Sequence, residues 1–196
     1  ISAVLARMEA IDMPLLIHGE VTDPDVDVCD REALFIERHL KPLRQRHPLL
    51  RIVLEHITTE ESATYIREAH QSGDDRIAAT ITPHHLHLNR NAMFIGGLRS
   101  DFYCLPVVKR ECHRRALVKA ATSGLSCFFL GTDSAPHPRS GKESSCGCAG
   151  IFNALHALES YAAVFEQEGA LEHLEGFASE HGPRFYGMPL NTDIVK

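Results

Sequence analysis

The sequence of 196 residues lacks the long apolar runs, the basic excess and the cysteine framework that mark several protein classes. Its longest apolar runs, 14–17 and 127–130, are far too short to cross a bilayer. Twenty basic and 26 acidic residues give a formal net charge of −6, which argues against a nucleic-acid or anionic-membrane binder. Six scattered cysteines with no Cys-x-x-Cys pair do not make a secreted disulfide scaffold.

A signal peptide is also missing, because Arg7, Glu9 and Asp12 interrupt the N-terminal stretch. The default expectation is a reduced, cytoplasmic protein. Apolar residues make up 44% and charged residues 23%, with no biased tract, which is typical of one sizeable folded domain. The chain opens with Ile1 inside a predicted helix, so we expect it to be a piece of a longer protein.

The pattern of apolar residues predicts strands and helices in alternation. Short apolar runs predict buried strands at 15–20, 51–56, 77–83 and 125–132. Helical spacing predicts helices at 2–11, 31–46, 59–72, 109–123, 151–168 and 170–180, with a loop-rich stretch at 84–107. Thr58 and Glu61 are expected to form the capping box of the third helix.

This alternation predicts a parallel α/β sheet. Four strands in 196 residues suit a (β/α)₈ barrel with long loops. A complete barrel needs about 250 residues and eight strands. The sequence therefore predicts half of a barrel.

Three of the predicted strands end in residues that bind metals, namely His18, His56 and Asp133. The carboxyl ends of barrel strands share one rim, where active sites are built. Imidazole nitrogens and carboxylate oxygens are the usual ligands of a hydrolytic Zn²⁺. This pattern alone supports two interpretations equally: the three residues form a metal site, or each is an ordinary hydrogen-bonded residue at the end of a strand.

The remaining eleven of the thirteen histidines offer weaker candidates. His84, His85 and His87 begin the loop after Pro83, where hydrogen bonding or packing is favoured over metal binding. His137 lies in a stiff turn four residues after Asp133 and can bind a substrate anion or be an ordinary loop histidine.

The closely spaced cysteines of Cys146-Gly147-Cys148 are expected to be structural thiols, since two thiols without partners make a poor metal site.

Several segments together resemble dihydroorotase of the single-function bacterial type, in the amidohydrolase superfamily. They are 15–20, 55–59, 79–86, 103–106, 131–137, 142–150 and 182–187. The family has a (β/α)₈ barrel with two Zn²⁺ ions, bridged by a carboxylated lysine and a hydroxide. The resemblance implies that His18 and His56 hold the second zinc, and that Asp133 is a ligand of the first zinc and the general base.

The resemblance also implies the substrate contacts. They are backbone groups of Leu105 and Ala149, the ring of His137 on the substrate carboxylate, and His18 close by. The family's first-strand His-x-His, its substrate-binding Arg and Asn, and its bridging lysine have no match here. The candidate lysines lie in predicted helices or loops: Lys41, Lys109, Lys119 and Lys142.

Residues 1–196 are therefore expected to be the C-terminal part of one barrel domain, about strands five to eight, whose partner is the missing N-terminal half. The implied activity is reversible hydrolysis of dihydroorotate to N-carbamoyl-aspartate in pyrimidine biosynthesis. The expected enzyme is a homodimer that binds no nucleic acid and no membrane, and this part alone is expected to be inactive. The alternatives are a hydantoinase- or deaminase-type amidohydrolase and a non-catalytic scaffold subunit.

Overall fold

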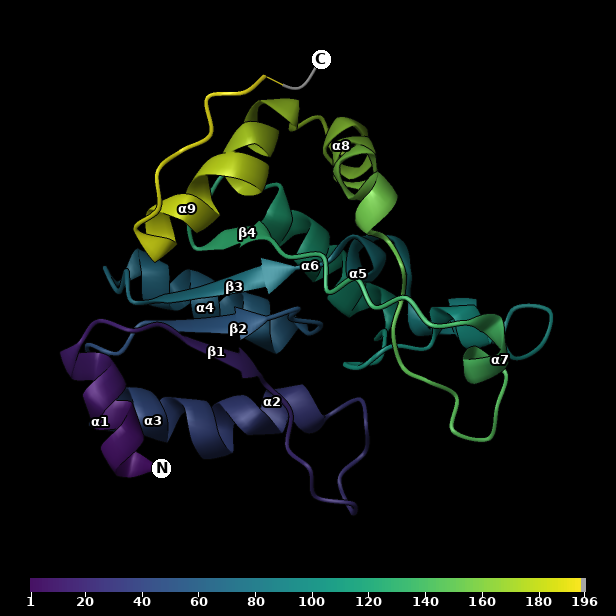
Figure 1. The fold of residues 1–196 in the computed structure, drawn as a ribbon, viewed down its shortest axis with the longest axis horizontal. Helices are drawn as coiled ribbons and strands as arrows, with labels where there is room; N and C mark the ends of the chain where they lie inside the picture. Colours follow the sequence, from purple (N-terminus) through teal and green to yellow (C-terminus); the bar gives the residue numbers. More distant parts are fainter. Residues whose placement is uncertain (195–196) are drawn as a thin grey trace.

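The computed structural model describes residues 1–194, and a parallel sheet lies at its centre (Figure 1). Its strands, in spatial and sequence order, are β1 (Leu15–His18), β2 (Ile52–Glu55), β3 (Ile77–Ile81) and β4 (Phe128–Leu130). The register pairs Leu15 with Ile52, Ile52 with Ile77, and Ala79 with Phe128. The four strands thus run in one direction and end at one edge, as the sequence predicts.

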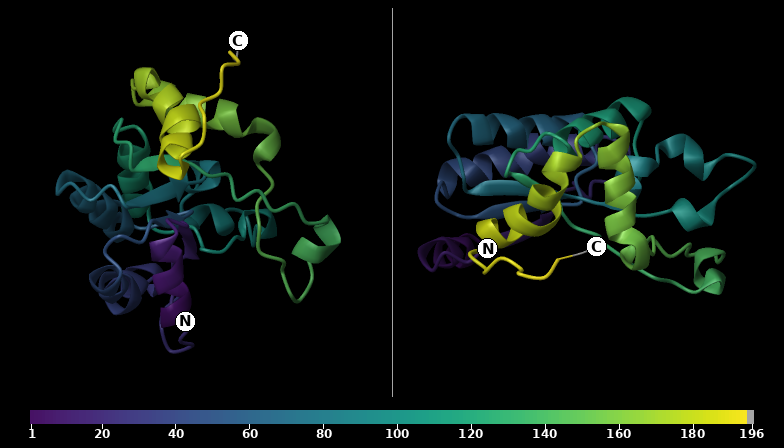
Figure 2. Two further views of the ribbon diagram at one scale, coloured as in Figure 1. Left: turned by 60° about the vertical axis from the view of Figure 1, so that its left-hand side comes forward. Right: turned by 90° about the horizontal axis from the view of Figure 1, so that it is seen from above.

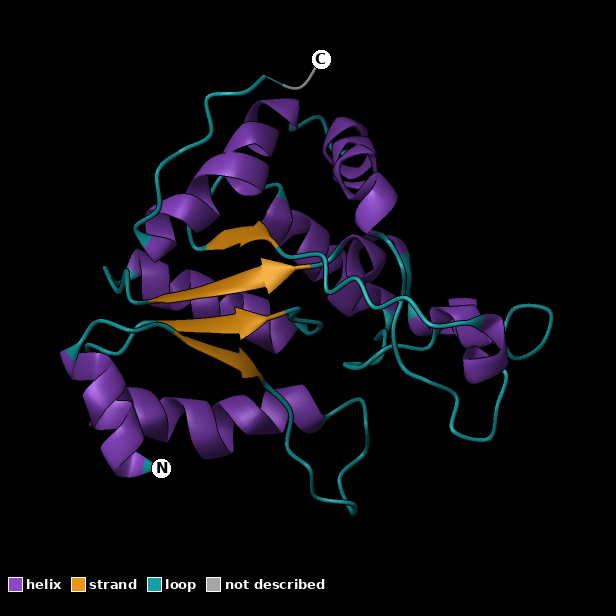
Figure 3. Cartoon of the chain, viewed as in Figure 1, coloured by secondary structure: helices purple, strands orange, loops and turns teal. Residues whose placement is uncertain are grey.

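Helices connect the strands (Figure 3), and several of them pack on one face of the sheet in the main apolar core. They are α1 (Ser2–Ala10), α2 (Arg31–Phe35), α3 (Lys41–Arg46), α4 (Glu60–Gln71), α5 (Pro83–His87), α6 (Glu111–Ala121), α7 (Arg139–Lys142), α8 (Ala157–Gln167) and α9 (His181–Tyr186). A π-helical turn, Ile36–Leu40, joins α2 to α3, and a second one, Gly176–Glu180, leads into α9. Short 3₁₀ turns are Arg90–Met93, Ser100–Phe102, Ala154–His156 and Leu171–His173. Within residues 1–194, no helix is long and apolar enough to cross a membrane.

Some predicted boundaries are wrong. The stretch expected to be a loop begins with α5, because Pro83 fits the first helical turn and the Thr82 side chain accepts a hydrogen bond from the His85 amide. The expected cap of α4 is also wrong. Thr59 is the N-cap and accepts from the Ser62 amide, whereas the Thr58 hydroxyl donates elsewhere, to a buried carboxylate described below.

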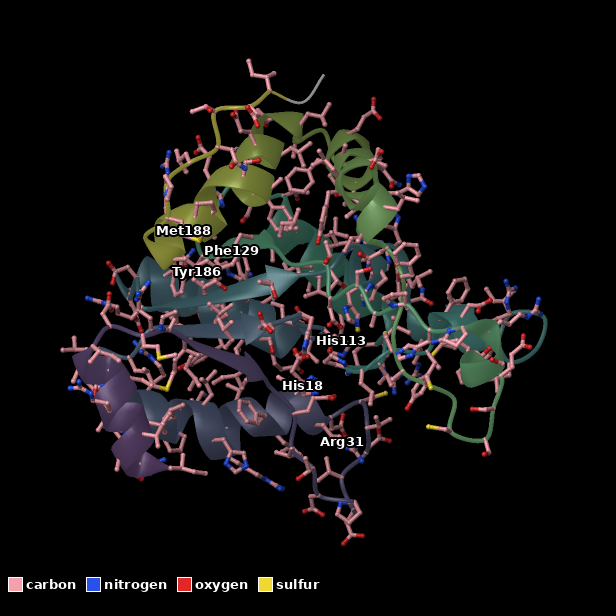
Figure 4. All side chains as sticks on the ribbon, in the orientation of Figure 1. His18, Arg31, His113, Phe129, Tyr186 and Met188 are labelled. Carbon is pink, nitrogen blue, oxygen red and sulfur yellow. The ribbon has the colours of Figure 1, made fainter. Side chains whose placement is uncertain are left out.

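The two faces of the sheet are covered differently. Side chains at alternating positions of the strands pack against the helices in one large apolar core, which includes Ile52, Leu54 and Phe128. The opposite face carries only a small cluster, in which Phe129 packs against Tyr186 of α9. Figure 2 shows α9 on the other side of the sheet from α3 and α4, and Figure 4 places Phe129, Tyr186 and Met188 together.

The second face and both outer strands are incompletely covered. Leu16 of β1 is 50% exposed, and β1 and β4 each have one edge without a strand partner among the described residues. Residues 1–196 produced alone are therefore expected to self-associate, because open strand edges and exposed apolar surface favour aggregation. Light scattering and thermal melting check this expectation. A monomer that melts cooperatively would contradict it.

Candidate active site

His18 and His56 end neighbouring strands, and their rings face each other at the carboxyl edge of the sheet. The ring centroids are 4.9 Å apart in an edge-to-face arrangement. His18 lies at the tip of β1 (Figure 4), and His56 directly follows β2. The carboxylate of Asp133, after β4, is near enough to favour protonation of both rings. The three predicted strand-end residues therefore belong to one edge of the fold.

Glu20 holds the ring of His18 from the side. The His18 Nε2 donates to Glu20 Oε2 at 2.9 Å, and this hydrogen bond raises the pKa of His18. With the proton on Nε2, the Nδ1 keeps a lone pair that a metal can use. The other Glu20 oxygen lies 3.9 Å from the ammonium of Lys109, which is also buried. A carboxylate between an imidazole and an ammonium fixes the orientation of the histidine.

His56 is buried and has an unpaired ring nitrogen. Its Nδ1 makes no hydrogen bond within the described structure. Burial lowers the pKa of His56, so the ring is neutral. A neutral imidazole is the form that binds a metal ion. The donor set of His18 and His56 thus fits the zinc ligation that the resemblance implies, although the assignment stays a prediction.

His56 and Asp133 both have a left-handed backbone, with φ of 43° and 42°. Residues other than glycine adopt this conformation at a cost, and it clusters at functional sites. The His56 amide donates to the Thr80 hydroxyl at 2.7 Å, which holds the turn after β2 against β3. Near β4, Gly131 lies so close to Thr80 that a Cβ there would be 2.5 Å from the Thr80 Cβ. This close approach lets the segment before Asp133 lie against β3.

A buried carboxylate, Glu32 of α2, fixes the loop after His56. It accepts hydrogen bonds from the amides of Thr58 and Thr59, from both of their hydroxyls, and from the Ser62 hydroxyl. Glu32 is only 3% exposed, yet every donor around it is a neutral group of the β2–α4 connection. Glu32 therefore links α2 to the loop that carries His56.

The expected substrate contacts lie on two loops at the same edge. The His137 Nε2 donates to the Ala149 carbonyl at 3.0 Å, and the ring is otherwise exposed. Leu105 follows Cys104 in the segment between the 3₁₀ turn 100–102 and α6, and its side chain is exposed. The structure brings His137 and Ala149 together.

His84, His85 and Cys104 form the one set of three metal-binding side chains in residues 1–194 whose ligand atoms all lie within 4.8 Å. In His85, the Nδ1 accepts from the Thr82 hydroxyl at 2.7 Å and the Nε2 donates to the Pro106 carbonyl at 3.0 Å. Burial raises the pKa of Cys104 to about 12, so its thiol keeps its proton. These hydrogen bonds favour the predicted structural role of His85 over metal binding.

His84 is also engaged. Its Nδ1 accepts from the Asn153 amide at 2.9 Å, and the same amide donates to the Thr132 carbonyl at 2.9 Å. Burial and the nearby His56 lower the pKa of His84 to about 4. The neutral ring thus connects α5 to the residue before Asp133.

Sequence reasoning missed four charged residues with buried side chains at this edge: Glu20, Glu32, Lys109 and Lys142. Lys109 was expected to begin the helix at 109–123, but α6 starts at Glu111 and Lys109 is 3% exposed. Glu20 could have been found, because a carboxylate two residues after a strand-end histidine can reach its ring. Glu32 and Lys142 give no local signal, since their partners come from distant segments.

Replacing Glu32 with alanine is expected to destabilise the complete protein by at least about 3 kcal/mol, because several buried donors lose their acceptor at once. Chemical denaturation measures the change. Glu37→Ala, an exposed carboxylate in the same helical stretch, is the control and should cost less than about 1 kcal/mol. Equal effects of the two variants would contradict the role of Glu32.

The whole chain is similar in sequence to proteins of one family. It is 73% identical over 195 residues to a dihydroorotase of Synechococcus sp. strain RCC307, covering 100% of this chain and 55% of that protein. It is 64% identical over 193 residues to a dihydroorotase of Nitrosomonas europaea, covering 98% of this chain and 54% of that protein. No family model matches the chain. The chain thus spans about half the length of the curated relatives it matches.

Solved structures agree with the sequences. A Saccharomyces cerevisiae dihydroorotase in complex with 5-fluoroorotic acid superposes with a TM-score of 0.86 at 38% identity, covering 95% of this chain and 53% of that one. A Campylobacter jejuni dihydroorotase superposes with a TM-score of 0.83 at 33% identity, covering 97% of this chain and 52% of that one. A hydantoinase of Arthrobacter aurescens, at 18% identity and a TM-score of 0.77, shares the fold. The predicted half-barrel fold and the resemblance to dihydroorotases are therefore confirmed, over the whole of this chain and about half of theirs.

Proposed function

We propose that residues 1–196 supply about half of the active site of a zinc-dependent dihydroorotase. The observation that carries this proposal is the meeting of His18, His56 and Asp133 at one edge of the sheet, in a chain similar to dihydroorotases along its whole length. The reaction is the reversible hydrolysis of the cyclic amide of dihydroorotate to N-carbamoyl-aspartate, a step of pyrimidine biosynthesis in the cytoplasm.

The same proposal assigns a partner to the uncovered sheet face. Residues 1–196 form the C-terminal part of one barrel domain, and the N-terminal half of that barrel pairs with β1 and β4 and covers the face that carries Leu16. That half brings the remaining zinc ligands and the bridging lysine, and the complete enzyme is a homodimer. Completion of the barrel gives the exposed side of His18 its other neighbours.

The residues divide the zinc ligation between two ions. His18 and His56 would hold one ion and Asp133 the other, which agrees with their ligand atoms not forming a single compact set. Zinc bound there would lower the pKa of water to about 7 and polarise the scissile carbonyl. Glu20 keeps the proton of His18 on Nε2, which leaves the Nδ1 lone pair for a metal ion.

Asp133 moves the proton during the reaction. Its carboxylate accepts the proton of the attacking water and returns it to the amide nitrogen that leaves the ring. The Asp133 carboxylate lies near enough to His18 and His56 for its charge to favour the protonated form of both rings. In the synthetic direction the same steps run backwards, so the Asp133 carboxylate first accepts the proton of the attacking nitrogen and then returns it to the oxygen that leaves as water.

His137, Leu105 and Ala149 bind the substrate. His137 receives the carboxylate, and the backbone groups of Leu105 and Ala149 receive the polar edge of the ring. The yeast relative was solved with 5-fluoroorotic acid, a cyclic carboxylate of the same chemical class. A hydantoinase-type activity would act on neutral cyclic amides, and the high identity to dihydroorotases favours the carboxylate substrate over it.

In the complete enzyme, His18→Ala or His56→Ala is expected to remove about one zinc equivalent and most activity, since sites with few protein ligands tolerate little loss. Elemental analysis measures the zinc content. His85→Ala and Cys146→Ser are matched controls that should keep it unchanged. Full zinc content in both ligand variants would contradict the assignment.

Asp133→Asn and His137→Ala separate chemistry from binding. Asp133→Asn should lower kcat by about 10²–10⁴ or more, because a proton acceptor and a ligand are lost. His137→Ala should keep zinc and lower kcat/KM for dihydroorotate by about 10- to 150-fold, the effect of one charge-assisted hydrogen bond.

Steady-state kinetics on dihydroorotate and on a neutral cyclic amide provide the comparison. If His137→Ala lowers kcat/KM as much for the neutral amide as for dihydroorotate, His137 does not bind the carboxylate.

A further inference from the structure

Lys142 is a buried lysine, 6% exposed, at the end of the one-turn helix α7, and the proposed chemistry does not use it. Its ammonium donates hydrogen bonds to three backbone carbonyls, those of Tyr103 at 2.8 Å, Cys148 at 2.9 Å and Gly150 at 2.7 Å. An ammonium group has three N–H donors, so each of them has a partner. The Lys142 side chain therefore links three backbone carbonyls to one another.

The three carbonyls belong to the two segments that carry the expected substrate contacts. Cys148 and Gly150 flank Ala149, and Tyr103 lies two residues before Leu105. The Gly150 amide donates to the same Tyr103 carbonyl at 2.9 Å. Lys142 thus joins the backbone beside Ala149 to the backbone beside Leu105.

The loop after α7 is held mainly by hydrogen bonds, among them those from the Cys148 amide to the Gly141 carbonyl and from His137 to the Ala149 carbonyl. None of residues 143–149 is buried, so the loop has no apolar core of its own. Gly150 has a φ of 149°, and a Cβ there would lie 2.6 Å from the Ala135 Cβ, which shows how closely the loop end packs on the turn before His137. His137 holds the Ala149 carbonyl itself, and the Lys142 ammonium holds the carbonyls on both sides of Ala149.

We propose that Lys142 is a positioning residue for substrate binding, which holds the backbone of Ala149 and Leu105 in the geometry that receives the cyclic carboxylate. This inference rests on the proposed function. It assigns no zinc ligation to Lys142, which shares no hydrogen bond with His18, His56 or Asp133.

The test uses the complete, zinc-loaded enzyme and 5-fluoroorotic acid as the probe, with calorimetry for its Kd. Lys142→Met keeps the length of the side chain and removes its donors. The Kd should rise by about tenfold or more, because three buried carbonyls lose their partner and the loop shifts. KM for dihydroorotate should rise in parallel, with kcat changed by less than about threefold and zinc content unchanged. Lys119→Met, an exposed lysine in α6, is the control.

Lys142→Arg is the second variant and decides the question if Lys142→Met does not fold. It keeps the charge, but a planar guanidinium cannot direct its donors to three carbonyls around one point. Its Kd should rise by about threefold or more. An unchanged Kd in the folded variants, or a loss of zinc that matches the loss of binding, would overturn the inference. Failure of the unsubstituted enzyme to bind the probe would instead overturn the proposed function.

Discussion

A parallel sheet brings the carboxyl ends of its strands to one edge, and the candidate site depends on this constraint. The register of β1, β2 and β3 sets His18 beside the turn that carries His56. Most helices pack on the side chains that point to the opposite face, while Glu32 of α2 also fixes the loop that follows His56. Alternation along β1 thus separates Leu15 and Ile17, which pack against the core, from the candidate ligand His18.

Beyond the apolar core, buried charged side chains hold the loops in place. None of residues 143–149 in the loop after α7 is buried, so this loop has no apolar core of its own. Glu32 collects amide and hydroxyl donors of the loop after β2, and Lys142 collects carbonyls of the loop after α7. An ion surrounded by neutral backbone dipoles has its hydrogen bonds satisfied without a counter-charge. Each charge therefore stabilises a defined loop shape that side-chain packing alone would leave open.

The sequence predicts the features that depend on neighbouring residues. Apolar runs identify the four strands and their common edge, and the residues at the strand ends follow directly. The resemblance supplied the roles of Leu105 and Ala149, which the pattern alone does not indicate. The capping box at Thr58 failed because its hydroxyl bonds to Glu32, 26 residues earlier in the chain. Lys142 was hidden for the same reason, since one of its carbonyls lies 39 residues away.

Helices cover one face of the sheet and leave most of the other face open. The residues that stabilise the chain and the candidate functional residues therefore lie on different faces. One face is closed by its own helices, so its core needs no further chain. The other face carries His18 and Leu16 with only α9 at its far end, where Phe129 meets Tyr186. In the complete barrel that we propose, this second face points inward, so the candidate ligand-binding residues and the surface for the other half coincide. Under that proposal, completing the barrel buries apolar area and assembles the site in the same step.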